Sequence, residues 1–189
     1  MLQKYKDKTD EELVSLSLKD QDFFYYLASR YEKKLLGYIR KTFFLSLHDS
    51  EDILQNVFLN IYKNLNGFDS KLKFSSWAYR ITHNEAISFL RKKKSRPDMD
   101  SYFTEEEYQK ISSDINIEKE MDIKFQKKEI DKIISLLDEK YREVLILKYI
   151  EDKSYEEISD IIKKPLGTIA TLISRAKKQF KKIKKETNG

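Results

Sequence analysis

The feature that most constrains the fold is a long apolar stripe near the C-terminal end of the sequence. Apolar residues recur there with the spacing of one helix face, at Ile169, Leu172, Ile173, Ala176, Phe180 and Ile183. The other face carries short polar side chains and cations, with seven Lys or Arg among the eleven residues Arg175–Lys185. Such a helix packs its apolar face on other helices and leaves its cations in solvent.

A shorter helix is predicted just before this one. Ser154 and Glu157 have the spacing of a capping box, which marks a helix start. Pro165 ends this helix because it has no backbone N–H to donate. The second helix is expected to begin near Gly167, with Thr168 as its N-cap. The pair indicates a DNA-binding helix-turn-helix, although an ordinary helical hairpin with a solvated basic face shares part of the pattern.

Composition predicts an all-α fold. The sequence has only 4 Gly and 2 Pro, and no stretch alternates in polarity for long. With no Cys and two His, a disulfide framework, a thiolate zinc site and a cysteine nucleophile are excluded, and we expect no metal and no cofactor. None of the common catalytic motifs occurs, so we expect no enzyme. There is neither a signal peptide nor a long apolar run, which predicts a cytoplasmic protein without membrane insertion.

Charge divides the chain into three segments. Residues 1–97 hold 18 Lys or Arg against 12 Asp or Glu, residues 98–122 hold 2 against 9, and residues 123–189 hold 17 against 11. We therefore predict two small helical domains, 1–97 and 123–189, joined by a flexible acidic linker. Two basic domains favour a polyanionic partner. Whether the domains pack together is left open by the sequence.

Helix starts can be placed along the first domain. One helix is predicted to begin at Thr9, a second to cover about 20–44, and a third to open with the acidic residues 49–52. A fourth runs from Phe74 to a basic stretch that Pro97 ends. In the second domain, Asp138 is expected to cap a helix that precedes the helix-turn-helix.

Three segments, in order, resemble bacterial RNA polymerase sigma factors of the extracytoplasmic-function (ECF) type, within the sigma-70 family. SEDILQNVFLNIYKNLNGFD resembles region 2.2, and KFSSWAYRITHNEAISFLRKKK resembles regions 2.3 and 2.4. LLDEKYREVLILKYIEDKSYEEISDIIKKPLGTIATLISRAKKQF resembles region 4. The resemblance implies a sigma-2 domain and a sigma-4 domain. It also implies a factor that binds core RNA polymerase and directs promoter-specific initiation by recognising and melting promoter DNA.

The resemblance implies partners and site residues as well. The expected partners are core polymerase, at its β′ clamp helices and β flap, promoter DNA and an anti-sigma factor. Polymerase binding is expected at Asp52, Gln55 and Asn56. Single-stranded DNA of the minus-ten element is expected at Lys71, Lys73, Phe74, Trp77, Arg80 and Asn84. Duplex DNA of the minus-thirty-five element is expected at Thr168, Ala170, Thr171, Ser174, Arg175 and Lys178.

The residues expected to bind single-stranded DNA suit an extruded base, because aromatic rings beside cations replace the stacking and the hydrogen bonds that the base loses. From the residues alone, a lone Trp such as Trp77 is more often part of a core than a nucleic-acid contact. Asp52 fits a helix N-terminus equally well. His83 is expected to be a partly buried side chain with a satisfied hydrogen bond. Asn56 departs from the family, which has Glu there.

The helix-turn-helix also departs from the family pattern, which is close to GTVKSR where this chain has GTIATL. Ala170 and Leu172 stand where cations are customary, and Lys163 replaces the usual Gly of the turn. We expect an altered or weakened minus-thirty-five preference, with non-specific affinity supplied by the Lys-rich tail. A footprint identical to that of a factor with the usual residues would contradict this.

Two other classes of protein remain open at this point. A helix-turn-helix regulator could bind duplex DNA independently of polymerase, and it would need a dimer interface or an effector pocket. A helical scaffold could carry basic faces only for solubility, and it would bind neither nucleic acid nor polymerase. Binding to core polymerase distinguishes a sigma factor from both.

Overall fold

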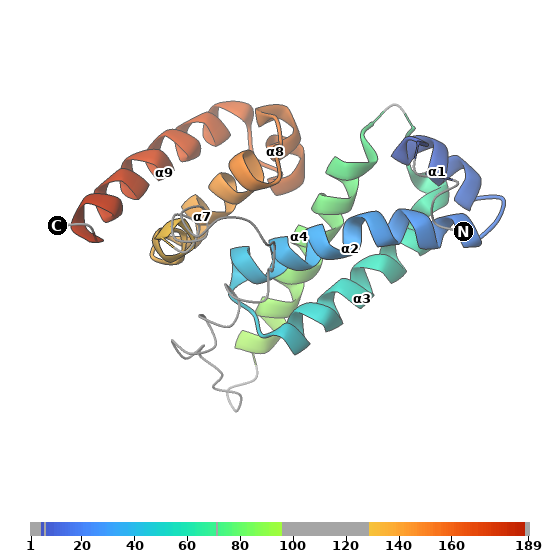
Figure 1. Ribbon diagram of the computed structural model, residues 1–189, viewed down its shortest axis with the longest axis horizontal. Coiled ribbons are helices and arrows are strands. Elements are labelled where there is room, and N and C mark those ends of the chain that lie inside the picture. Colours follow the sequence, from blue (N-terminus) through green and yellow to red (C-terminus); the bar gives the residue numbers. More distant parts are fainter. Residues whose placement is uncertain (1–4, 6, 71, 96–128, 188–189) are drawn as a thin grey trace.

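A computed structural model describes residue 5 and residues 7–70, 72–95 and 129–187. These residues form helices and contain no strand (Figure 1), which confirms the predicted all-α class. The predicted linker, 98–122, and Lys71 lie outside the described residues. Within the described ranges, no helix is long and apolar enough to cross a bilayer. The same ranges hold no group of three or more His, Asp or Glu side chains suited to a metal ion.

The first half is a bundle in which α2 packs on α1, α3 and α4. Its elements are α1 (Asp10–Ser17), α2 (Asp22–Phe43), α3 (Leu47–Asn64), a 3₁₀ turn η2 (Leu65–Gly67) and α4 (Phe74–Lys94). The helix start predicted at Thr9 is confirmed, and Thr9 forms a capping box with Glu12. Helix α3 starts earlier than predicted because Ser46 caps it and accepts the Asp49 N–H at 3.0 Å. Asp49 then lies in the first turn, where the helix dipole favours a carboxylate.

The second half contains the helical residues 129–135, followed by α7 (Glu139–Leu145), a π-helical turn η3 (Ile146–Ile150), α8 (Tyr155–Ile162) and α9 (Leu166–Thr187). Helix α9 packs along α7 and α8. Its apolar stripe faces inward as predicted, with Ile169, Ile173 and Ala176 buried. Asp138 is the N-cap residue of α7, but its side chain makes no capping hydrogen bond.

The helix-turn-helix forms with one correction. The capping box is present, since Glu157 N–H donates to Ser154 Oγ at 3.1 Å and Ser154 N–H donates to Glu157 Oε2 at 2.7 Å. Helix α9, however, begins at Leu166, and the Pro165 carbonyl accepts the Thr168 N–H at 2.8 Å. Thr168 therefore lies in the first turn and is not the N-cap. Proline is well suited to a helix start because no intrahelical acceptor exists there for an N–H.

The turn contains a backbone position that favours glycine. Lys163 has φ 57° and ψ 47°, in the left-handed region, where a Cβ is disfavoured. We expect Lys163→Gly to raise the free energy of unfolding by about 1 kcal/mol, measured by urea denaturation. Lys163→Ala is the control, because it also removes the 2.7 Å ion pair with Asp160 but keeps the Cβ. Equal stability of the two variants would contradict the backbone explanation.

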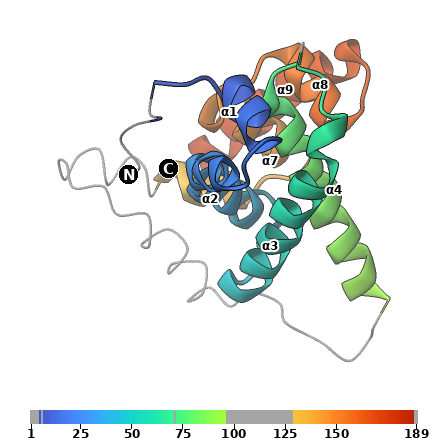
Figure 2. The same cartoon turned by 90° about the vertical axis from the view of Figure 1, so that its right-hand side faces the viewer.

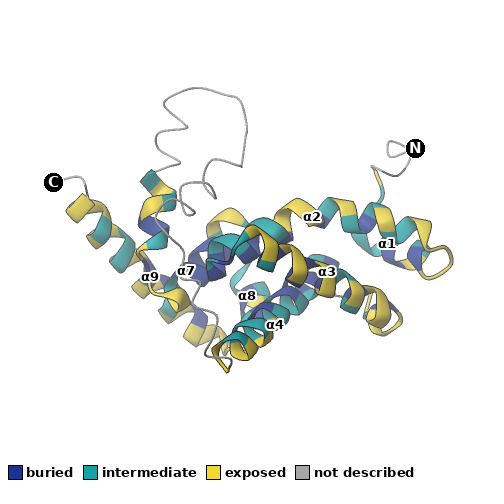
Figure 3. Cartoon of the chain, turned by 90° about the horizontal axis from the view of Figure 1, so that it is seen from below, coloured by how far each residue is buried: buried dark blue, intermediate teal, exposed yellow. Residues whose placement is uncertain are grey.

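The two halves pack against each other, with α8 on α4 and α7 on α2 (Figures 1 and 2). A buried polar cluster lies at this contact, where dark-blue residues of both halves meet in Figure 3. Tyr38 OH donates to Glu143 Oε1 at 2.8 Å, and His83 Nδ1 lies 2.6 Å from the same oxygen. Burial, and then the nearby Glu143, raise the pKa of the Tyr38 hydroxyl well above its usual value. His83 is thus partly buried and hydrogen-bonded, as expected.

Three further contacts tie the halves together. The buried Arg142 donates from Nε to the Thr42 carbonyl at 2.8 Å, and its guanidinium stacks on the Phe44 ring at 3.8 Å. On α4, Tyr79 donates a hydrogen bond to Glu151, whose pKa is raised by burial. A buried charge without a partner is costly, so these pairs favour one relative placement of the halves.

Candidate nucleic-acid interface

An aromatic cluster surrounds the start of α4. The half-buried Trp77 ring lies 5.2 Å from the Phe68 ring and 5.8 Å from the Phe74 ring, measured between centroids. Phe74 is only 2% exposed, and its N–H donates to Glu11 Oε1 at 3.0 Å. This corrects the prediction that Phe74 contacts DNA directly. The ring instead supports Trp77 from the core, because a buried face cannot stack on a base.

A cavity of about 550 Å³ opens beside Trp77, between α3 and α4. It brings together three of the predicted residues, Trp77, Arg80 and Asn84. The sequence interpretation missed the other lining residues, Asn60, Lys63, Asn64, Gly67, Ile81 and Glu85. The polar positions Asn60 and Asn64, one turn apart on a helix rich in apolar residues, were the available signal. An aromatic wall, amide groups and cations give this cavity the chemistry that binds a nucleobase.

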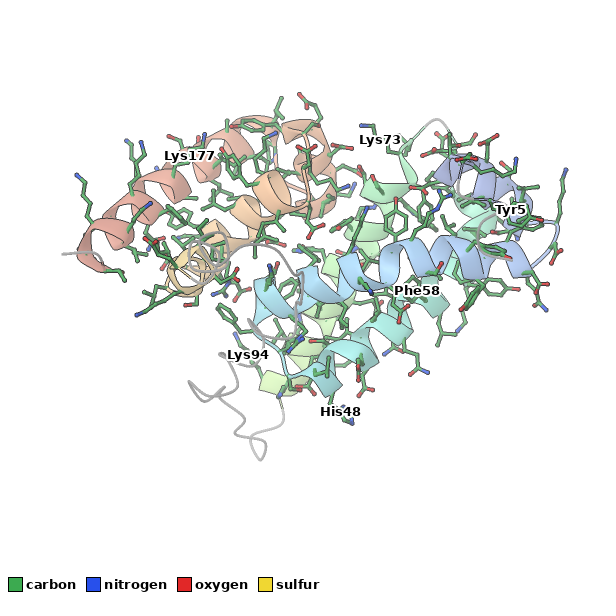
Figure 4. All side chains as sticks on the ribbon, in the orientation of Figure 1. Tyr5, His48, Phe58, Lys73, Lys94 and Lys177 are labelled. Atoms are coloured by element: carbon green, nitrogen blue, oxygen red, sulfur yellow. The ribbon has the colours of Figure 1, made fainter. Side chains whose placement is uncertain are left out.

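Helix α8 covers part of the predicted DNA-binding surface. Arg80 Nη1 lies 3.0 and 3.1 Å from the two carboxylate oxygens of Asp160. Lys73, labelled at the start of α4 in Figure 4, lies 3.2 Å from Glu157 Oε1, and Ser76 Oγ donates to the same oxygen at 3.2 Å. Two of the predicted DNA-binding cations are therefore paired with carboxylates of the other half of the chain.

The pKa values of these two carboxyl groups reflect the pairing. Burial works to raise the pKa of Glu157, but the Ser154 N–H and Lys73 outweigh it and hold that pKa below its usual value. Burial likewise opposes ionisation of Asp160, while Lys163 and Arg80 keep the pKa of Asp160 low. Both groups are thus carboxylates at neutral pH and can compete with phosphate for the same cations.

The outer face of α9 is exposed to solvent. All six residues predicted for the minus-thirty-five element are exposed: Thr168, Ala170, Thr171, Ser174, Arg175 and Lys178. They share one side of the helix, opposite its buried stripe. The exposed Lys177, labelled in Figure 4, begins the Lys-rich tail, and its Nζ lies 5.4 Å from the centre of the Tyr149 ring.

The outer face of α3 combines polar and apolar groups. Asp52, Gln55 and Asn56 are all exposed, as a protein-binding surface requires. One and two turns further along the same face, Leu59 is 50% and Tyr62 is 46% exposed. Tyr62 fits the apolar periodicity of this helix but lies half in solvent. Two large apolar side chains in solvent next to polar ones are typical of a protein-binding site.

Comparison with known proteins identifies the family. The Sigma-70 region 2 model matches residues 27–96, and the Sigma-70 region 4 model matches residues 127–180. The ECF RNA polymerase sigma factor SigW of Bacillus subtilis is 33% identical over 168 residues, which cover 86% of this chain and 89% of SigW. The chain belongs to the ECF sigma factors of the sigma-70 family. The ECF RNA polymerase sigma-E factor of Haemophilus influenzae is 28% identical over 178 residues, covering 91% of this chain and 93% of that relative.

Solved structures confirm the fold of this ECF sigma factor. CnrH, in complex with the cytosolic domain of CnrY, has a TM-score of 0.65 at 19% identity and covers 93% of this chain and 97% of CnrH. The sigma factor RpoE from Bartonella quintana, in complex with the anti-sigma factor NepR, has a TM-score of 0.61 at 22% identity, covering 81% and 91%. Family membership makes the chain a transcription initiation factor, and an unrelated duplex-binding regulator is not favoured.

Proposed function

We propose that this ECF sigma factor binds core RNA polymerase and directs it to promoters. Residues 1–97 would dock on polymerase and melt the minus-ten element, residues 98–122 would link the domains, and residues 123–189 would contact the minus-thirty-five element. As a specificity subunit in the cytoplasm, it would leave catalysis to the polymerase. The observation that carries this proposal is the Trp77 cavity, which joins an aromatic wall to amides and cations.

The cavity supports a mechanism for strand melting. A base that leaves the duplex loses its stacking and pairing, and a pocket that supplies both lowers the cost of extrusion. Trp77 offers a ring face, while Arg80 and Asn84 offer donors to the base edge or to the backbone. Lys73, and Lys71 two positions before it in the sequence, would neutralise phosphates of the same strand.

Polymerase docking would use the outer face of α3. Asp52, Gln55 and Asn56 would form polar contacts with the β′ clamp helices, and the exposed Leu59 and Tyr62 would supply the apolar area. The Asn56 amide donates to the Asp52 carbonyl at 3.0 Å, so this helix turn is ordered before binding. The second domain would dock on the β flap.

The paired cations imply that the free protein adopts a closed form, in which α8 packs on α4 and pairs with Arg80 and Lys73. This form would have to open before these cations could bind DNA. Asp160 and Glu157 hold Arg80 and Lys73, so α8 and the promoter strand would compete for the same side chains. Polymerase would favour the open form by binding each domain separately. An anti-sigma factor is a further proposed partner, supported by the two structural neighbours, each solved with a bound protein.

Run-off transcription tests the proposed function. Purified core polymerase, this protein and fragmented host genomic DNA are expected to give discrete transcripts that depend on the protein. Aligning the sequences upstream of these starts would give both promoter elements. Failure to bind core polymerase, or unchanged starts, would refute the proposal and favour a duplex-binding regulator.

The recognition helix leads to a paired prediction. Arg175→Ala is expected to lower promoter affinity about tenfold and to relax the preference at one minus-thirty-five position, because Arg reads guanine with two hydrogen bonds. Lys178→Ala, one turn further along, is expected to weaken binding to all DNA sequences by the same factor, because the Lys178 side chain would contact a phosphate and not a base. Binding to a library of minus-thirty-five variants separates the two effects. Identical profiles for both variants would show that Arg175 reads no base.

A further inference from the structure

The cavity beside Trp77 contains a carboxylate, which is unexpected in a site for a polyanion. Glu85, on α4, is the one acidic residue among those that line it. Asn60 Nδ2, on α3, donates to Glu85 Oε1 at 2.6 Å, which fixes the carboxylate at the wall between the two helices. A negative charge near phosphates weakens general DNA binding, so this residue would have to act by selecting among bases.

We propose that Glu85, positioned by Asn60, makes the cavity select an extruded base that carries an exocyclic amino group and reject thymine. The inference rests on the proposed melting of the minus-ten element and adds the identity of the captured base. Neither Asn60 nor Glu85 is among the residues for which the family resemblance implies a role.

Hydrogen-bond chemistry gives the direction of selection. A carboxylate only accepts hydrogen bonds, and it has about four acceptor sites, of which Asn60 occupies one. Cytosine, adenine and guanine each present an amino group that can donate to such an acceptor. Thymine has no amino group, and its two carbonyl oxygens repel a carboxylate. The one donor of thymine on this edge, its N3–H, lies between these two oxygens, so thymine in this cavity would pair with Glu85 less favourably than an amino base does.

The other lining residues complete the recognition of an amino base. Asn84 and Asn64 carry amide donors that can meet the ring nitrogen or carbonyl acceptors next to the amino group. Trp77 supplies the stacking face, which does not depend on the identity of the base. Lys63 and Arg80 line the same cavity. Their positive charges would reduce the repulsion between Glu85 and the phosphates of the bound strand. Selectivity thus depends on Glu85, whereas affinity depends on its neighbours.

The test uses polymerase holoenzyme and fluorescent single-stranded oligonucleotides of a promoter that it opens, with each minus-ten position changed to all four bases. At one position, the unmodified holoenzyme is expected to bind amino bases about tenfold more tightly than thymine. Glu85→Gln keeps the shape but adds a donor for thymine O4, and the ratio is expected to fall to about twofold. The affinity of the holoenzyme for the oligonucleotides as a group should stay the same or rise, because the variant removes a negative charge near the phosphates.

Two control variants separate a loss of base selectivity at the cavity from a general effect of removing a negative charge. Glu32→Gln makes the same chemical change on an exposed position of α2 and should leave every ratio unchanged. Asn60→Ala releases the carboxylate and should reduce the ratio while polymerase binding persists. It also replaces Glu85→Gln as the test if that variant does not assemble into holoenzyme.

The outcomes are distinguishable from failure of the proposed function. If the unmodified protein gives specific transcripts, yet Glu85→Gln or Asn60→Ala keeps the tenfold ratio, the inference about Glu85 is overturned and the sigma activity stands. A preference for thymine at every contacted position would also overturn it. If the unmodified protein supports no transcription at all, the proposed function fails first.

Discussion

Replacing Trp77 with Ala is expected to lower the rate of promoter opening roughly a hundredfold, because one base–aromatic stack is worth ~1–3 kcal/mol and the cavity also loses a wall. Polymerase binding should persist, since the exposed residues of α3 proposed for docking do not line the cavity. Permanganate reactivity of unpaired thymines measures opening, and holoenzyme assembly on a native gel measures binding. A template that is already unpaired over the minus-ten element should recover part of the activity, because extrusion is then unnecessary.

Two variants control this prediction. Leu59→Ser, at the 50% exposed position of α3, should do the reverse by weakening polymerase binding while leaving the cavity intact. Trp77→Phe keeps a ring against Phe68 and should retain most of the opening activity. If Trp77→Ala lowers polymerase binding and thermal stability as much as it lowers opening, the ring is only part of the core and the proposed capture of a base is wrong.

Asp160→Lys is expected to open the closed form, because it replaces a carboxylate 3.0 Å from Arg80 with a like charge. The free protein should expand, with a larger radius of gyration in small-angle X-ray scattering. Its affinity for a single-stranded minus-ten oligonucleotide should rise about tenfold, a typical coupling between two competing contacts. Both changes come from releasing Arg80 and moving α8 away from α4.

The matched control is Glu156→Lys, which makes the same charge change on a fully exposed residue of the first turn of α8. It should leave the protein compact and raise oligonucleotide affinity much less. Adding Arg80→Glu to Asp160→Lys should restore the compact form by reversing the ion pair. Equal gains in affinity from Glu156→Lys and Asp160→Lys would mean that net charge, and not the closed contact, controls access to DNA.

Sequence reasoning failed where a residue had to be placed on one side of a helix by its tertiary surroundings. Phe74 and Trp77 are both aromatic residues at the start of α4, yet the first is buried and the second forms a cavity wall. Tyr62 fits the periodicity of a core position but lies half in solvent. Periodicity gives the angle of a side chain around its helix, whereas exposure depends on which other helices are present.

The sequence by itself determined most of the helices, two capping boxes, the helix-turn-helix and the family, because these signals lie within a few residues of one another. The capping boxes at Thr9 and Ser154 link residues three positions apart. Only the tertiary structure decided that Glu85 meets Asn60, 25 positions away, and that Glu143 meets Tyr38, 105 positions away. Such pairs leave no local pattern, because they form only when separate helices pack. The cavity and the closed form both consist of contacts of this kind.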